Sequence, residues 1–171
     1  MRNRVVLAVA LLAVSLAGRA GVTEPTRTIP FHGGEAVVRT VAAGEEVTVK
    51  DSAGQVLAQS TCDSGTGSYD QIVAFLTALK QQVGARDRPA VAALVDYPLR
   101  INQLPRKPRL IRSASQLQAD YAGVFTPQLG RKIAKLDPHV VFCRDGMAMG
   151  GNGVVWASDH GGTLRLVVIN P

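Results

Sequence analysis

The amino-acid sequence predicts an α+β protein made behind an export leader. Apolar residues recur at helical spacing over residues 69–83, and residues 113–135 repeat this pattern. Short runs rich in β-branched residues lie on both sides of these helices. An uncharged, largely apolar run occupies residues 5–17. Together these patterns predict two groups of strands separated by helices.

Residues 1–20 have the features of a signal peptide. Arg2 and Arg4 precede the apolar run, and small residues that suit a cleavage site follow it. The run is too short to cross ~30 Å of hydrocarbon as a helix. We therefore expect export to a bacterial periplasm or the extracellular space, with no stable membrane insertion after cleavage. Cleavage would remove 3 of the 19 basic residues and none of the 13 acidic ones, which leaves 16 against 13.

A small β-meander is predicted after the leader. Residues 21–34 are polar and contain prolines, so we expect a flexible lead-in. Residues 35–62 then carry three strand-like runs, at residues 36–41, 45–50 and 55–61, with turn residues between them. Three short strands cannot bury a core alone, so the meander must pack on the rest of the chain.

The main domain is expected over residues 68–171. Ser68 and Gln71 have the spacing of a capping box, which predicts that a helix begins at residue 69 and continues to residue 83. Gly84 is expected to end it. A short second helix is predicted over residues 88–94, because Pro89 suits a first turn.

Two strands and a longer helix are predicted next along the chain. Residues 95–102 and 109–113 predict the strands, and the apolar stripe over residues 113–135 predicts the helix. Gly123 and Pro127 are expected to break this helix into two pieces.

The tail predicts three antiparallel strands, at residues 139–144, 153–158 and 163–170. A glycine-rich loop joins the first two of them. A phosphate-binding loop would need a helix behind it, so that its N-terminus faces the anion. This loop leads into a strand instead, so we interpret it as a hairpin connection.

Several short motifs accompany this order of elements. They are Tyr97-Pro98-Leu99 in a strand, Tyr121 with Phe125-Thr126-Pro127 in the long helix, and Gly146, Met147, Gly151, Gly153 and Trp156 near the last hairpin. On these residues the segment 68–171 resembles the NTF2-like superfamily, also called the cystatin-like or SnoaL-like fold, and in particular its exported bacterial members. The resemblance implies a cone in which a strongly bent antiparallel sheet wraps the helices. The meander lies outside the resemblance.

The resemblance also implies a pocket between the concave face of the sheet and the helices. Side-chain alternation along the strands then predicts the lining of this pocket. The assignment depends on register, because a slip of one residue exchanges the two faces. The residues expected to line the pocket are Tyr97, Leu99, Tyr121, Phe125, Phe142, Arg144 and Trp156.

Enzymes of this superfamily often use a pocket Asp, His or Tyr as acid or base. The candidates in this chain are Asp96, Asp145 and Tyr121. An apolar pocket would raise the pKa of such a carboxyl group, as a general base requires. A structural role explains the two acids equally well, since Asp96 begins a strand and Asp145-Gly146 is an ordinary turn pair.

The two cysteines, Cys62 and Cys143, could pair in an oxidising compartment. The bridge would close a loop of about 80 residues, for which the chain-entropy treatment gives about 4 kcal/mol. The alternative is a buried thiol at Cys143 with Cys62 unpaired.

Other classes of protein have little support in the sequence. The three histidines lie far apart, so we expect no metal site, and no motif indicates a cofactor. Basic residues cluster over residues 100–112 with no aromatic residue among them, which argues against nucleic-acid binding.

The favoured interpretation is a non-catalytic exported module that binds a small apolar or amphipathic ligand or a partner in the cell envelope. The first alternative is a cofactor-independent isomerase, cyclase or hydratase that uses a pocket Asp and Tyr. The second is an exported inhibitor or immunity-type protein that acts through the rim of the hairpins. The outer sheet face of the resembled fold commonly forms dimers, so a homodimer through that face is compatible with each of these.

Overall fold

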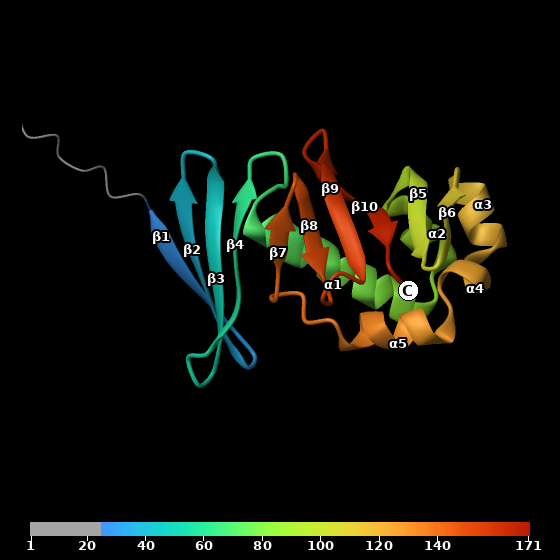
Figure 1. The fold of residues 1–171 in the computed structure, drawn as a ribbon. Coiled ribbons are helices and arrows are strands. Elements are labelled where there is room, and N and C mark those ends of the chain that lie inside the picture. The colour runs from blue at the N-terminus through green and yellow to red at the C-terminus, as the bar shows by residue number, and fades with distance from the viewer. Residues whose placement is uncertain (1–24) are drawn as a thin grey trace, which may run out of the picture.

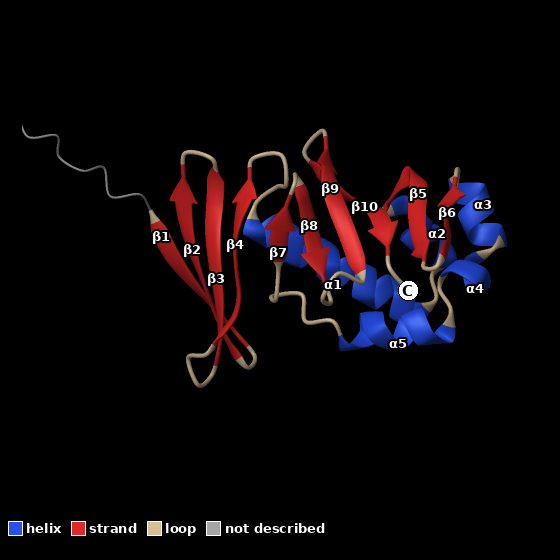
Figure 2. Cartoon of the chain, viewed as in Figure 1, coloured by secondary structure: helices blue, strands red, loops and turns tan. Residues whose placement is uncertain are grey.

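The computed structural model describes residues 25–171, so the expected signal peptide lies outside the described residues. The described chain forms a four-stranded sheet, a six-stranded sheet and five helices, which confirms the α+β class. The two sheets stand side by side, and helix α1 runs behind the six-stranded sheet (Figures 1 and 2). A search of the described helices finds none that is both long enough and apolar enough to span a membrane.

The N-terminal sheet is an antiparallel meander of four strands rather than the expected three. Its strands are β1 (Thr26–Phe31), β2 (Gly34–Val41), β3 (Gly44–Asp51) and β4 (Val56–Asp63). The additional strand, β1, lies within residues 21–34, which were predicted to be a flexible lead-in. That prediction was wrong for residues 26–31.

Strand β1 was not predicted because proline, here Pro30, is typical of loops and turns. A proline is tolerated in an edge strand, where its missing N–H costs no ladder hydrogen bond. Strand β1 is such an edge, and its side chains Ile29 and Phe31 pack against the core. The ring of Phe31 also stacks on His139, with ring centroids 4.4 Å apart.

Two helices follow the meander, α1 (Tyr69–Ala85) and α2 (Arg88–Ala93). The capping box at Ser68 is confirmed, because its side chain accepts from the Gln71 N–H and the Gln71 side chain accepts from the Ser68 N–H. The prediction that Gly84 ends α1 was wrong. The helix continues to Ala85, and Arg86 adopts the left-handed cap conformation with φ 56°.

A hairpin and three short helices come next. They are β5 (Val95–Gln103), β6 (Arg106–Ile111), α3 (Ala114–Ala119), α4 (Tyr121–Val124) and α5 (Pro127–Lys135). The long helix predicted here is therefore broken twice, at Asp120 and at Phe125-Thr126. Thr126 caps α5 by accepting from the Leu129 N–H at 3.3 Å.

The tail contains four strands, β7 (Phe142–Arg144), β8 (Met147–Gly150), β9 (Val155–His160) and β10 (Thr163–Ile169). Three were expected, because residues 147–150 were taken as part of the glycine-rich loop. The turn between β7 and β8 has Asp145 at φ 53° and Gly146 at φ 71°. Two successive positive values suit a tight two-residue hairpin, so Asp145-Gly146 turns the chain early and residues 147–150 return as a strand.

The six-stranded sheet has the order β6-β5-β10-β9-β8-β7. Of the strands predicted in the tail, β9 and β10 pair antiparallel, as expected, whereas β7 pairs with the unpredicted strand β8 and not with β9. Strands β5 and β10, however, pair in parallel, so the sheet is mixed rather than antiparallel. This pairing joins the β5–β6 hairpin to the tail and makes a single sheet of both.

Helix α1 packs against one face of this sheet. Its side chains Leu76 and Leu79 are buried, as are Leu166 and Ile169 on β10. Gly150 allows the closest approach, because a Cβ there would lie 2.9 Å from a methyl group of Leu76. The core therefore extends from the sheet into the helix layer as one cluster.

A disulfide joins the two sheets where β4 and β7 lie side by side. Cys62 and Cys143 are paired, which confirms the predicted bridge. The Cys143 N–H also donates to the Ser60 hydroxyl at 3.1 Å. Covalent and hydrogen-bonding links thus fix the meander to the edge of the larger sheet.

Removing this bridge should lower the free energy of unfolding substantially. The cysteines are 81 residues apart, and a loop of that length is worth about 4 kcal/mol in the chain-entropy treatment. We expect the Cys62→Ala/Cys143→Ala variant to unfold at a much lower urea concentration than the parent. A reducing agent should shift the parent curve toward that of the variant and leave the variant unchanged; equal curves in oxidised and reduced parent protein would contradict the expected contribution.

Candidate functional site

The predicted pocket lining is divided between the two faces of the sheet. Leu99 is buried on the face that packs against the helices. Phe142 and Trp156 both pair with Met149 across the sheet, so they share one face. The adjacent residues, Cys143, Ala148 and Ala157, are buried, so it is their face that packs against the helices. Phe142 and Trp156 therefore belong to the opposite face. The expected pocket of seven residues is therefore not assembled.

Arg144 lies on the same side as Phe142, two residues along β7, and it is exposed. The reason for the error is the register of the tail strands. Alternation gives two sets of side chains, and only the packing of Cys143 and Val155 selects which set faces the helices. The assignment made from the sequence chose the wrong set for β7 and β9.

The aromatic rings of Tyr97, Tyr121 and Trp156 do not converge either. The Tyr97 hydroxyl donates to the Ala92 carbonyl at 3.1 Å, and the indole N–H of Trp156 donates to the Gly153 carbonyl at 3.1 Å. Tyr121 stacks on Phe125 within the helix layer, with ring centroids 5.0 Å apart.

The two candidate carboxylates lie at the surface. Asp96 Oδ2 is 3.4 Å from Nδ1 of His160, and both side chains are well exposed. Asp145 stands in its turn and accepts from the Arg144 guanidinium at 3.1 Å. Neither acid lines either of the two larger cavities, so the structure does not bring an acid, a tyrosine and a cavity together.

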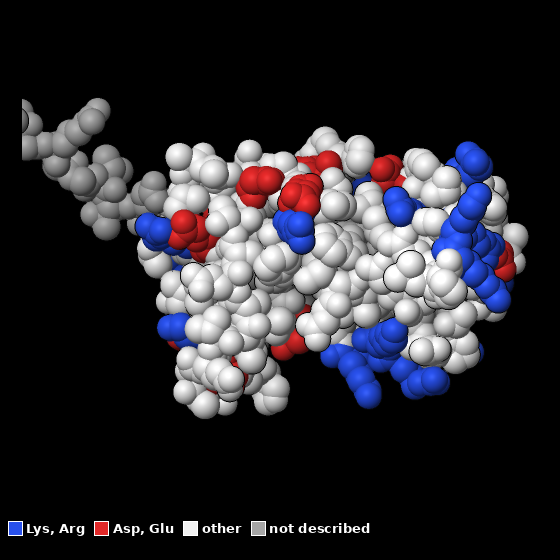
Figure 3. Space-filling view, viewed as in Figure 1, with Lys and Arg blue, Asp and Glu red and all other residues white. Residues whose placement is uncertain are grey.

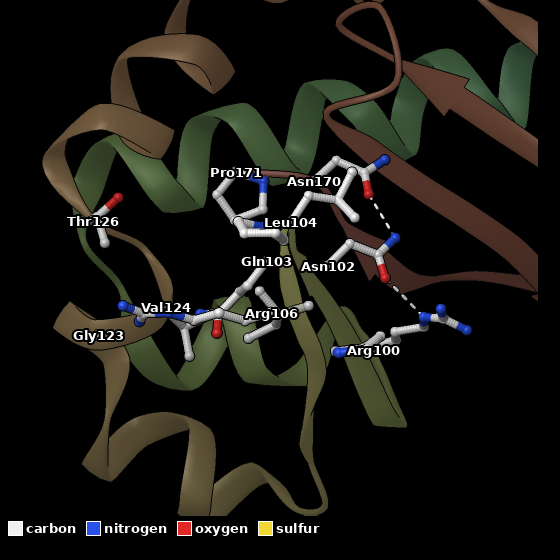
Figure 4. Close-up of a pocket in the computed structure, with 13 residues that line it drawn as sticks. Arg100, Asn102, Gln103, Leu104, Arg106, Gly123, Val124, Thr126, Asn170 and Pro171 are labelled. Carbon is white, nitrogen blue, oxygen red and sulfur yellow. Dashed lines mark hydrogen bonds between the residues drawn. The ribbon is translucent and has the colours of Figure 1, made fainter.

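A cavity of about 880 Å³ lies where β5 and β10 end, beside Gly123 and Val124 of α4 (Figure 4). Ile101 and Val124 form its buried floor. Leu104, which is 94% exposed, stands at its rim on the β5–β6 turn. The polar side chains in its wall are those of Arg100, Asn102, Gln103, Arg106, Thr126 and Asn170.

Three of these polar side chains form a hydrogen-bonded chain, drawn in Figure 4. Arg100 Nε donates to Asn102 Oδ1 at 2.8 Å, and Asn102 Nδ2 donates to Asn170 Oδ1 at 2.7 Å. Asn170 Nδ2 in turn donates to the Gly153 carbonyl, which also accepts from Trp156. The cavity wall is thereby connected to the indole on the outer face.

The parallel pairing of β5 with β10 explains why the two amides meet. Ile101 is paired with Ile169, and Asn102 and Asn170 come directly after them. Strands that run in the same direction end at the same edge of a sheet, so the amides lie side by side although they are 68 residues apart. Sequence analysis missed both residues, since a polar residue after a strand looks like the start of any loop.

A second cavity of about 510 Å³ lies within the helix layer, between the end of α1 and the start of α5. Tyr121 and Phe125 line it, so two of the seven predicted residues do border a cavity. The Tyr121 hydroxyl is the one buried side-chain polar atom in residues 25–171 that has no hydrogen-bond partner. A buried hydroxyl without a partner lowers the stability of the folded state.

The described part of the chain contains no group of three or more His, Cys, Asp or Glu side chains that could hold a metal ion. The chemistry that its cavities can support is hydrogen bonding by amides and a hydroxyl, charge pairing by arginines, and apolar contact. Comparison with protein-family models, curated proteins and solved structures gave no match for this chain.

The three tyrosines, Tyr69, Tyr97 and Tyr121, all have a raised pKa. Burial is the main cause in each, because it disfavours the charged phenolate. At Tyr69 the carboxylates of Asp137 and Asp70 raise the pKa further. At Tyr121 the nearby Arg88 and Arg86 oppose the effect of burial.

A titration followed by tyrosinate absorbance tests these shifts. In urea all three phenols should ionise near the ordinary value of 10, whereas the folded chain should ionise at higher pH. Above about pH 10 the folded state then binds more protons than the unfolded state. The contribution of these phenols to the free energy of unfolding should therefore be fully present below about pH 10 and should decrease as the pH rises further. Identical titrations with and without urea would contradict the burial of these phenols.

Proposed function

We propose that this chain is an exported, non-catalytic binding module of the NTF2-like type. Its ligand would be a small amphipathic molecule held in the 880 Å³ cavity at the ends of β5 and β10. The observation that carries this proposal is the pair of linked amides, Asn102 and Asn170, above an apolar floor. That combination matches the usual character of small-molecule sites, which are mostly apolar with a few placed polar groups.

The fold supports the NTF2-like part of the proposal. The helices stand against one face of a six-stranded sheet, and the cavity opens between the end of that sheet and α4. The resemblance predicts a pocket between the sheet face and the helices, whereas this cavity lies at the end of the sheet and its lining differs from the predicted one.

Export is supported by the leader pattern in residues 1–20 and by the bridge between Cys62 and Cys143. Disulfides persist in oxidising compartments such as the bacterial periplasm. The leader itself lies outside the described residues.

The chemistry of the ligand follows from the cavity wall. An amide side chain offers both a donor and an acceptor, so Asn102 and Asn170 suit a neutral hydroxyl or amide group. Ile101 and Val124 suit an apolar portion of the same molecule. A sugar or amide head on a short alkyl chain combines both properties, and envelope components supply such groups.

The single tryptophan provides a direct test of binding. Trp156 and Asn170 donate to the same carbonyl, that of Gly153, so a ligand that engages Asn170 should alter the indole emission. We expect hexyl glucoside or hexanamide to produce a saturable change in this emission. Native mass spectrometry of the protein recovered from a bacterial periplasm should also detect a retained small molecule. No saturable change and no retained molecule would refute the proposal.

Replacing one amide should weaken binding of the same probe. Asn102→Leu removes the partner of Asn170 from the wall, and a neutral hydrogen bond is worth about 1 kcal/mol, so we expect the dissociation constant to rise about fivefold to tenfold. Gln59→Leu, on an exposed position of β4, is the matched control and should bind as the parent does. Thermal unfolding of both variants checks that the fold is retained; equal affinities would place the probe elsewhere.

Replacing the two surface carboxylates separates binding from catalysis. Asp96→Asn and Asp145→Asn keep the shape of each side chain, and asparagine tolerates the positive φ at residue 145. Because neither residue lines the cavity, we expect the affinity for hexyl glucoside to stay unchanged. A marked loss of binding in either variant would favour the enzyme alternative. The same conclusion would follow if the parent protein converted a probe chemically and either variant no longer did so.

A further inference from the structure

The second cavity has an unusual balance of charge. Arg86, Arg88 and Arg131 line it, and no aspartate or glutamate is among the residues that do so. Two acids adjacent in sequence to lining residues have other partners: Asp87 accepts from the Ala90 N–H at 3.0 Å, and Asp120 pairs with Arg109. Within residues 25–171, no carboxylate lines the cavity beside these arginines.

Contacts position the backbone of one of these arginines and the guanidinium of another. Arg86 occupies the left-handed cap of α1, where its backbone N–H donates to the carbonyls of Gln82 and Val83. Arg88 lies over the ring of Tyr121, with its guanidinium carbon 5.7 Å from the ring centroid. An arginine stacked on an aromatic ring keeps its N–H groups free to bind an anion.

The third side of the cavity is the first part of α5. Thr126, Pro127, Gly130 and Arg131 all border it. The first turn of α5 has no acidic side chain, and the positive end of the helix dipole is directed toward this region. Helix α5 carries the basic residues Arg131, Lys132 and Lys135, and Figure 3 shows basic side chains along the lower margin of the molecule, where Figure 1 places α5.

The floor of the cavity is apolar and aromatic. Val83, Tyr121 and Phe125 are each at most 7% exposed. The Tyr121 hydroxyl is itself buried and has no hydrogen-bond partner. A ligand that fits must therefore present an apolar surface to the rings and an anionic group to the arginines.

We propose that this second cavity binds an amphipathic organic anion, with a carboxylate or phosphate between Arg88 and Arg131 and an alkyl or aryl portion on Tyr121 and Phe125. Guanidinium groups bind both kinds of oxyanion through paired hydrogen bonds. This site shares only Thr126 with the cavity at Asn102 and Asn170, and α4 contributes Gly123 and Val124 to one and Tyr121 and Ala122 to the other. It would add an anion-binding function to the module.

The test compares octanoate, octyl phosphate and octanamide, which share one alkyl chain. Binding is followed by amide chemical shifts in ¹⁵N-labelled protein. Octanoate should shift the resonances of residues 83–88 and 121–131 and should bind about tenfold more tightly than octanamide, because an interaction with a charged group is the stronger one. Octyl phosphate tells whether the site prefers a carboxylate or a phosphate head. Equal affinity of octanoate and octanamide, or shifts centred on Asn102 and Asn170, would overturn the inference.

Two variants on the same helix provide a matched comparison. Arg131→Gln and Lys132→Gln remove the same charge from α5, but only residue 131 lines the cavity. Arg131→Gln should weaken octanoate binding about tenfold, whereas Lys132→Gln should leave it close to the parent value. Equal effects of the two variants would mean that octanoate responds only to the general positive charge of the surface, and they would refute the proposed site.

Filling the cavity is the complementary test. A Cβ at Gly130 would meet no atom within 4 Å, and leucine favours a helix more than glycine does. Gly130→Leu should thus fold at least as stably as the parent and lose octanoate binding, while its response to hexyl glucoside stays intact. If Gly130→Leu binds octanoate as the parent does, the inference is wrong, and the proposal for the Asn102 cavity is unaffected.

Discussion

The parallel pairing of β10 with β5 is the constraint on which the larger sheet depends. It inserts the last strand of the chain between the β5–β6 hairpin and the three strands β7, β8 and β9. Without it the β5–β6 hairpin would be a separate two-stranded ribbon, which is at best marginally stable by itself. The same pairing brings Asn102 against Asn170, so the main cavity is a direct result of sheet topology.

The junction between the two sheets is a second constraint, and it works at the opposite edge. The meander cannot bury both of its faces alone, yet Val38, Val47 and Val49 are buried in the common core. The bridge between Cys62 and Cys143 and the hydrogen bond to Ser60 hold it beside β7. The meander thereby becomes an extension of the domain and lies far from both cavities (Figure 1).

The segment 120–127 separates the chemistry of the two cavities. Residues on one side of α4 meet the end of the sheet, where amides predominate, and residues on the other side meet the end of α1, where arginines predominate. The sequence predicted the bridge between the cysteines, which is confirmed, whereas Tyr121 and Phe125 line a cavity of the helix layer and not the predicted pocket. The sequence pattern assigned Phe142, Arg144 and Trp156 to the wrong face, because alternation defines two faces without saying which one is buried.

The sequence by itself determined the features that depend on neighbours along the chain. These are the α+β class, the capped helix at Ser68, the turn pair Asp145-Gly146 and the strands other than β1 and β8, since each follows from local propensity and hydrogen bonding. Only the tertiary structure decided the register of the tail, the parallel contact of β5 with β10 and the meeting of Arg88 with Tyr121. Those contacts join residues tens of positions apart, and their free energy comes from packing that no local pattern contains.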